Sequence, residues 1–158
     1  MSAPSPTPPR VPDAEFAQII RYAPLVSIDV VFKNQNGNVL VALRANEPAK
    51  DFYFVPGGII RKGETIADAF RRIVHTETAI ESELSNARPL GVYEHFYEKN
   101  RYRDSSYGTH YVCLAYEYLL KVDPKIALDT QHTKYRWMSV DDIIKAPNVH
   151  PYTKAYFR

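Results

Sequence analysis

Short runs of apolar and β-branched residues, separated by polar or glycine-containing segments, predict a protein rich in strands. The polar run at residues 34–38, Asn-Gln-Asn-Gly-Asn, is typical of a turn, so the runs on either side of it are expected to form a hairpin. Pro56 and the two glycines after it are expected to end the third run. The predicted strands cover residues 25–32, 39–43, 52–55, 89–98, 109–121 and 135–138, and the polar loop 99–108 joins the fourth to the fifth.

Helical periodicity is clearest over residues 65–80. Apolar residues recur there at spacings of three and four, which is typical of a helix with one face against a core. Thr65 with Asp68 resembles a capping box, with Asp in the place of the usual Glu or Gln. The apolar stripe consists of Ile66, Phe70, Ile73 and Val74.

Shorter helices are predicted near both ends of the chain. Residues 13–22 carry apolar positions at helical spacing, with Asp13 as a candidate N-cap. Ser139 with Asp142 opens another helix, and residues 150–158 are expected to form a short terminal one. Because strands occur before and after the long helix, and hairpins mix with crossovers, the fold class is α/β or α+β, a mixed sheet covered by helices.

The first twelve residues differ in composition from the rest. They hold five of the 12 prolines of the chain and show no apolar periodicity, so residues 1–12 are predicted to form a disordered tail. The remaining residues 13–158 have the length of one domain that can bury a core.

Charge and cysteine content narrow the function classes. The formal net charge is +2, and the 20 Lys and Arg residues are scattered along the chain, which argues against a nucleic-acid partner. No apolar run approaches the ~20 residues that span a bilayer, so no membrane partner is expected. The single cysteine, Cys113, lies in an apolar run and is interpreted as a core thiol. With no disulfide and no signal-peptide pattern, a cytoplasmic location is expected.

The segment from Gly57 to Glu77 carries the clearest chemical signal. A strand leads into two glycines, which let a backbone approach a ligand closely, and then into the capped helix. Four residues beyond Ile73 the apolar stripe reaches Glu77, so a carboxylate occupies a core-facing position. A buried carboxylate needs a cation partner, and Mg²⁺ prefers oxygen ligands such as carboxylates and phosphates. The alternative is that the stripe has ended and Glu77 is solvated.

This segment resembles the Nudix box, G-x5-E-x7-R-E-U-x-E-E-x-G-U, in which U is an aliphatic residue. The matching positions are Gly58, Glu64, Arg72, Val74, Glu77 and Ile80. Three positions differ: Ile73 and Thr76 stand in place of glutamates, and Ala79 in place of the glycine. Ordinary Nudix pyrophosphatases use several of the box acids to hold more than one metal ion. The resemblance therefore implies a Nudix fold that holds fewer metal ions.

A resemblance to one Nudix branch, the GDP-mannose mannosyl hydrolases, covers roughly residues 13–157. That branch shows the same loss of acids in the box. Its other matching segments are residues 23–29, 54–58, 94–97, 109–112, 131–132, 135–137, 148–150 and 155–157. The branch hydrolyses GDP-mannose or GDP-glucose to GDP and free sugar by breaking the C–O bond at the anomeric carbon with inversion. The resemblance therefore implies a nucleotide-sugar substrate and, from the habit of the family, a homodimer.

The resemblance also implies a metal site and catalytic residues. One Mg²⁺ per subunit, with Mn²⁺ as a substitute, would be held by the Gly57 carbonyl, Glu77 and the Gln131 side chain. His132 would be the general base that activates water, a role that suits the unperturbed pKa of histidine. The remaining catalytic positions are Arg72, Tyr111 and Asp29. For Arg72 the alternative is an ion pair on the helix, and for Tyr111 it is packing within a strand.

Four further residues are candidates for substrate contact: Arg44 and His95, which the resemblance implies, and Arg61 and Phe16. Arginine suits a diphosphate because its planar fork donates two parallel hydrogen bonds. Phe16 is a candidate for stacking on guanine, and the alternative for Arg44 is a solvated charge. The family carries an arginine where this chain has Ile59, but Arg61 points to the same side if this stretch is extended, and would replace it in part.

Two other functions stay open. A conventional Nudix diphosphatase that cleaves a P–O bond is disfavoured by the loss of acids at Ile73 and Thr76. A catalytically silent nucleotide-binding domain is disfavoured by Glu77, Gln131 and His132, because a pure binder has no need of a base that activates water.

Overall fold

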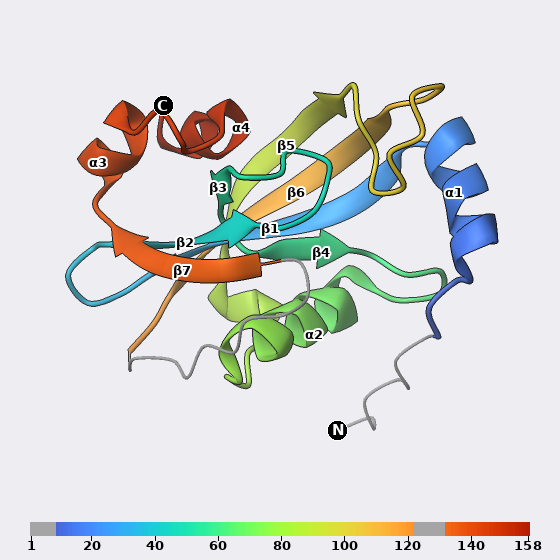
Figure 1. Ribbon diagram of the computed structural model, residues 1–158. Helices are drawn as coiled ribbons and strands as arrows, with labels where there is room; N and C mark the ends of the chain where they lie inside the picture. The colour runs from blue at the N-terminus through green and yellow to red at the C-terminus, as the bar shows by residue number, and fades with distance from the viewer. Residues whose placement is uncertain (1–8, 122–131) are drawn as a thin grey trace.

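A computed structural model of the protein describes residues 9–121 and 132–158. In these ranges a mixed sheet lies between helices, with α2 on one face and α3 and α4 on the other (Figure 1). The strands are β1 (Leu25–Lys33), β2 (Val39–Arg44), β3 (Tyr53–Phe54), β4 (Gly57–Ile59), β5 (Arg88–Tyr97), β6 (Thr109–Leu119) and β7 (His132–Met138). The helices are α1 (Asp13–Tyr22), α2 (Ile66–Thr78), α3 (Val140–Lys145) and α4 (Pro151–Lys154), with 3₁₀ turns η1 (Leu84–Asn86) and η2 (Ala155–Phe157). No helix of the described ranges has the length and apolar character to cross a bilayer.

The sheet is built around β1. This strand pairs in parallel with β6 along its whole length, from Leu25 opposite Tyr111 to Lys33 opposite Leu119. β6 pairs antiparallel with β5, and β2 pairs antiparallel with β3 and β7. The resulting order is β3-β2-β1-β6-β5, with β4 on β1 and β7 on β2. One parallel pair among antiparallel ones confirms the predicted mixed sheet.

The hairpin predicted between the first two strands forms only at its turn. The Asn34 carbonyl accepts a hydrogen bond from the Gly37 N–H, and β1 pairs with β2 at Lys33 opposite Val39. Nearer its start, β1 pairs with β4 instead. The predicted hairpin is therefore confirmed at its turn, and along the rest of its length β2 pairs with β3 and β7.

The two glycines form a strand where the sequence predicts a break. Gly57 stands opposite Asp29, and a Cβ on Gly57 would lie 2.4 Å from Asp29 Oδ1 and 2.6 Å from the Ile28 carbonyl oxygen. These separations are far inside van der Waals contact, so only glycine lets β4 lie this close to β1. Gly58 meets α2, because a Cβ there would lie 3.2 Å from Ile73 Cγ1.

α2 begins where the capping signal predicts. Thr65 occupies the N-cap position, and its hydroxyl accepts a hydrogen bond from the Asp68 N–H at 3.1 Å. The apolar stripe is buried from Phe70 onward, whereas Ile66 is 42% exposed. The core-facing part of the stripe is therefore one turn shorter than predicted.

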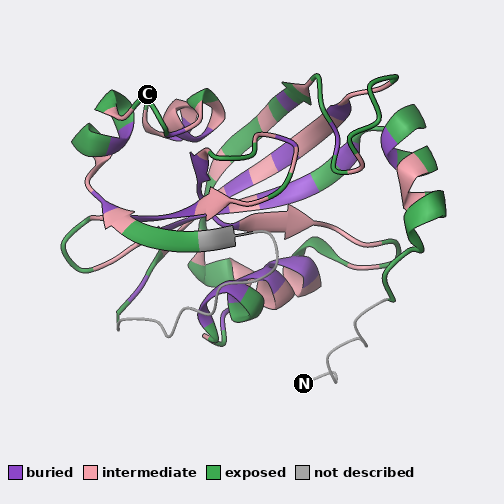
Figure 2. Cartoon of the chain, in the orientation of Figure 1, coloured by how far each residue is buried: buried purple, intermediate pink, exposed green. Residues whose placement is uncertain are grey.

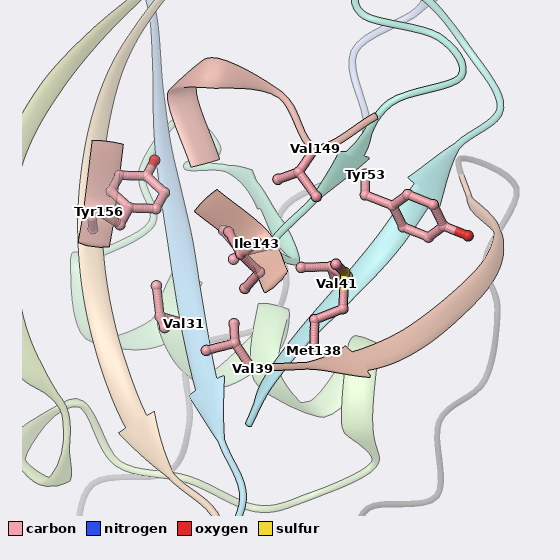
Figure 3. Close-up of a cluster of buried hydrophobic side chains, with 10 residues drawn as sticks. Val31, Val39, Val41, Tyr53, Met138, Ile143, Val149 and Tyr156 are labelled. Atoms are coloured by element: carbon pink, nitrogen blue, oxygen red, sulfur yellow. The ribbon is translucent and has the colours of Figure 1, made fainter. Parts of the chain in front are cut away.

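Two apolar cores lie on opposite faces of the sheet, and β1 and β2 therefore contain runs of consecutive buried residues (Figure 2). Ile28 and Val30 of β1 belong to the core under α2. Val31 belongs to the second core, with Ile143 of α3 and Tyr156 of η2 (Figure 3). Successive side chains of a strand point to opposite faces, so β1 contributes to both cores.

The first helix begins at Asp13 as predicted, but Asp13 is not its N-cap. Pro12 occupies that position and makes no side-chain capping bond. Asp13 instead accepts a hydrogen bond from the Tyr102 hydroxyl at 2.9 Å. Residues 1–8 lie outside the described part of the chain, so the disordered tail and the domain boundary stay predictions.

Replacing Ala79 by glycine should stabilise the protein. Ala79 ends α2 in the left-handed conformation, with φ 57°. We expect Ala79→Gly to raise the free energy of unfolding by about 0.5–1 kcal/mol, because glycine adopts this conformation without a Cβ clash. A thermal unfolding scan should show Tm higher by roughly 2–4 °C.

The matched control is Gly37→Ala. Gly37 has φ 78°, and no atom lies within 4 Å of an added Cβ, so only the backbone conformation opposes the change. This variant should lower Tm by a similar amount. An unchanged or lower Tm for Ala79→Gly would contradict the account of the helix end.

Candidate active site

Three strands bring polar side chains together on the sheet face away from α2. Tyr111 stands opposite both Leu25 and His95, and alternation places Asp29 and Cys113 on the same face. A carboxylate oxygen of Asp29, a ring nitrogen of His95 and the Cys113 sulfur lie within 4.8 Å of one another. The structure therefore gathers three predicted site residues, Asp29, His95 and Tyr111, on one surface.

The Asp29 carboxylate lies between the sheet and the C-terminal segment. The Tyr156 hydroxyl donates a hydrogen bond to Asp29 Oδ2. Burial raises the pKa of Asp29 from 3.8 to about 6, against the Tyr156 hydrogen bond and the Arg44 charge, which both lower it. A carboxyl group whose pKa is raised toward neutrality is typical of functional sites.

His95 is a buried, neutral imidazole. It is 5% exposed, and its ring stacks on that of Tyr152 with centroids 4.3 Å apart and an interplanar angle of 9°. Burial, with a smaller contribution from His150, lowers the pKa of His95 to about 4. Among the described residues its Nε2 atom has no hydrogen-bond partner. A buried polar atom of this kind can form a hydrogen bond with a ligand or a water molecule.

Arg44 supplies positive charge next to this face. Its guanidinium carbon lies 5.8 Å from the centroid of the Phe54 ring, and its buried Nε has no partner in the described part of the chain. Burial and the Arg44 charge lower the pKa of His150 to about 4. Burial raises the pKa of Tyr111, and Arg44 opposes that effect. A partly buried guanidinium with an unpaired donor suits an anionic group such as a phosphate.

The Gly57 carbonyl points away from β1. The flanking positions bond with β1, through the Pro56 carbonyl and the Ile60 N–H. Alternate residues of an antiparallel strand direct their carbonyls to the other side. Ile59 shows that direction, because its carbonyl accepts a hydrogen bond from Arg72 Nη2 of α2 at 2.9 Å. The Gly57 carbonyl therefore faces the side on which α2 lies.

Glu77 is 8% exposed, so the alternative of a solvated Glu77 is wrong. It lies one helical turn beyond Ile73, whose side chain packs on Gly58, and so shares the α2 face turned toward β4. Carboxylate and carbonyl oxygens are the ligands that Mg²⁺ prefers, so Gly57 and Glu77 fit a divalent cation. The third predicted ligand, Gln131, lies outside the described residues.

Arg72 forms a two-pronged ion pair with Glu64. The Nε–Oε1 and Nη2–Oε2 distances are 2.7 and 2.8 Å, and Glu64 also accepts a hydrogen bond from the Arg61 N–H at 2.9 Å. Burial opposes ionisation of Glu64, but the Arg72 bonds prevail and lower its pKa. These contacts tie the loop after β4 to α2. Arg72 is thus in an ion pair, but with a loop residue and not with a residue of the helix as the alternative expected. Contact between Arg72 and a phosphate stays a prediction.

The remaining predicted residues lie in three different places. Arg61 follows β4, and burial together with the Arg72 charge lowers its pKa. Phe16 lies on α1, where the Arg101 guanidinium carbon is 5.7 Å from the ring centroid. His132 begins β7, with its backbone paired to Arg44, and its side chain is outside the described atoms.

Several residues of this face have no role in the sequence analysis. Tyr152 and Tyr156 contact His95 and Asp29, but they carry no spacing that marks a site. Cys113 is buried, as a core thiol should be, yet it also lies beside Asp29. Cys113 could have been found from the sequence, because side chains two residues apart in a strand lie on the same face and Tyr111 is a predicted site residue.

Comparison with known proteins identifies the class. A model of the NUDIX domain matches residues 23–158, so the chain belongs to the Nudix family. The Low-salt glycan biosynthesis protein Agl8 of Haloferax volcanii is 35% identical over 149 residues, which cover 93% of this chain and 88% of that protein. The ADP-ribose pyrophosphatase of Methanocaldococcus jannaschii is 33% identical over 70 residues, which cover 44% of this chain and 40% of that protein.

Solved structures share the fold. The MutT NUDIX hydrolase from Burkholderia pseudomallei superposes with a TM-score of 0.67 at 22% identity, covering 84% of this chain and 95% of that chain. The MutT protein from Methanosarcina mazei gives a TM-score of 0.66 at 18% identity, covering 84% and 89%. The architecture is therefore the Nudix fold. With the family match, the chain is a Nudix hydrolase, a class whose members generally use divalent metal ions.

Replacing Asp29 by asparagine should change how stability depends on pH. A folded-state pKa raised from 3.8 to about 6 means that burial disfavours the ionised carboxylate, so stability present below pH 4 is lost as pH rises through 6. Asp29→Asn removes this loss. Its stability relative to wild type should rise by about 1–3 kcal/mol between pH 4 and pH 7.5 in denaturant titrations.

Asp104→Asn is the control of opposite sign. Hydrogen bonds from Ser106 lower the pKa of Asp104, so its contribution to stability is lost as pH falls. If the difference in free energy of unfolding between Asp29→Asn and wild type does not vary with pH, burial of the Asp29 carboxylate does not destabilise the protein.

Proposed function

We propose that this Nudix hydrolase converts GDP-mannose, or the similar GDP-glucose, to GDP and the free sugar. The bond broken would be the C–O bond at the anomeric carbon, with inversion. The proposal rests on one observation: α2 lacks two acids that hold metal ions in ordinary Nudix pyrophosphatases.

The two positions that lack acids make other contacts. Ile73 is buried and packs on Gly58. Thr76 donates its hydroxyl to the Arg72 carbonyl at 2.8 Å. Glu64 is paired with Arg72, whereas Glu77 is buried on the α2 face turned toward β4, the side to which the Gly57 carbonyl points. This arrangement supports one metal ion rather than the several of a conventional diphosphatase.

The Gly57 carbonyl, Glu77 and Gln131 would hold one Mg²⁺. Such an ion, when bound, neutralises charge on the departing diphosphate and so makes GDP a better leaving group. Arg44 would bind the same diphosphate through its unpaired Nε, and the Tyr111 hydroxyl would donate to it. A hydrogen bond from a charged guanidinium to a phosphate is shorter and stronger than one between neutral groups.

His132 would accept a proton from the attacking water. It begins β7 opposite Arg44, the residue proposed to contact the diphosphate. A positioned base of this kind contributes roughly 10²–10⁴-fold to rate. Attack from the side opposite GDP would invert the anomeric carbon, as in inverting glycosidases.

Asp29 and His95 would contact the sugar. Sugar hydroxyls donate and accept hydrogen bonds, so a carboxylate acceptor and a neutral imidazole with an unpaired Nε2 match them. The relative from Haloferax volcanii is named for glycan biosynthesis, which supports a sugar-containing substrate.

Product analysis tests the proposal. The protein should be incubated with Mg²⁺ and GDP-mannose, GDP-glucose or ADP-ribose, and the products separated by chromatography. GDP plus free hexose is expected, whereas GMP plus a hexose 1-phosphate would contradict the proposal. His132→Gln is the control: turnover should fall roughly 10²–10⁴-fold while GDP affinity persists. If wild type binds GDP and turns over none of the three, it is a binding domain and the proposal is wrong.

A further inference from the structure

The segment from His150 to Phe157 packs against two candidate substrate-binding residues, His95 and Asp29. Tyr152 stacks on His95, and its hydroxyl bonds both to the Phe96 N–H at 3.0 Å and to the Phe96 carbonyl at 2.9 Å. Tyr156 lies against β1 and β6 (Figure 3) and donates to Asp29. A single segment therefore contacts the two residues assigned above to the sugar.

Hydrogen-bond directions around Tyr156 follow from proton counting. An ionised carboxylate only accepts hydrogen bonds, so the phenol proton of Tyr156 belongs to its bond with Asp29 Oδ2. The Cys113 sulfur lies 3.5 Å from the Tyr156 oxygen. The Cys113 thiol also forms a hydrogen bond with Asp29, which acts to lower the pKa of that carboxyl. Asp29 therefore accepts hydrogen bonds from two neighbours, Tyr156 and Cys113.

The contacts of Asp29 with Tyr156 and Gly57 fix the orientation of the carboxylate. Asp29 Oδ2 is bound by Tyr156, while Oδ1 lies against the backbone of Gly57. The Tyr156 ring is 8% exposed and packs edge to face on Tyr93, with centroids 4.8 Å apart and an interplanar angle of 83°. A hydroxyl held by a packed ring can hold the group it binds within a narrow range of orientations.

We propose that Tyr156 is a positioning residue of this enzyme: its hydroxyl orients the Asp29 carboxylate toward the sugar of the bound substrate. The inference rests on the proposed function, because it takes Asp29 as a sugar contact. Tyr156 acts through Asp29 and does not itself touch the substrate.

The test is a double-mutant cycle between Tyr156→Phe and Asp29→Asn. Tyr156→Phe removes one oxygen and keeps the packed ring. With GDP-mannose it should lower kcat/KM about 10- to 100-fold. This is the rate change that corresponds to the free-energy cost of an acceptor that has lost its hydrogen-bond donor. In the Asp29→Asn background the same change should alter kcat/KM by less than about threefold, because coupled residues are not additive. GDP affinity in Mg²⁺ should stay within about twofold of wild type, because GDP lacks the sugar.

Tyr116→Phe is the matched control. Tyr116 packs on Phe70 in the core under α2, with centroids 5.7 Å apart, and its variant should keep wild-type kcat/KM. Three results would overturn the inference: wild-type kcat/KM for Tyr156→Phe, an equal loss in both backgrounds, or a parallel loss of GDP affinity. A wild type that releases no free sugar overturns the proposed function and this inference with it, whereas the other results leave the proposed function standing.

Discussion

The close approach of Gly57 to Asp29 sets the pairing of β4 with β1. Because an added Cβ would lie 2.4 Å from Asp29 Oδ1, β4 can reach β1 only with glycine at this position. The contact turns the carbonyls of Gly57 and Ile59 toward α2, and Gly58 meets Ile73 one residue further on. The ion pair between Arg72 and Glu64 then secures the loop that joins β4 to α2. The candidate metal ligands and the candidate sugar face thus meet at one backbone contact.

Burial on the sheet face away from α2 has a cost in stability. The carboxyl of Asp29 has a raised pKa and the imidazole of His95 a lowered one, in both cases chiefly because burial disfavours the charged form. Native proteins retain such groups where they are needed for binding or chemistry. The Tyr156 hydroxyl offsets part of this cost at Asp29. On this account, the C-terminal segment stabilises the site as well as closing the second core.

Local patterns predicted those parts of the fold that depend on local physics. The capping residues Thr65 and Ser139 begin helices where they were expected, because an N-cap bond involves only residues three apart. Apolar periodicity also placed Glu77 in a buried position. The pairing of Gly57 and Gly58 with β1 was not predictable, because it depends on a strand distant in sequence. The same limit applies to Tyr156, which meets Asp29 across most of the chain.

The central claim is that water attacks the sugar carbon and not phosphorus. Hydrolysis of GDP-mannose by the wild-type protein in ¹⁸O-labelled water with Mg²⁺, followed by mass spectrometry of both products, tests it most directly. The account predicts the label in the released hexose, which should first appear as the inverted anomer, and none in GDP. Label in a phosphate of either product would mean P–O cleavage, and would contradict the proposed roles of His132, Asp29 and the altered acid positions of α2.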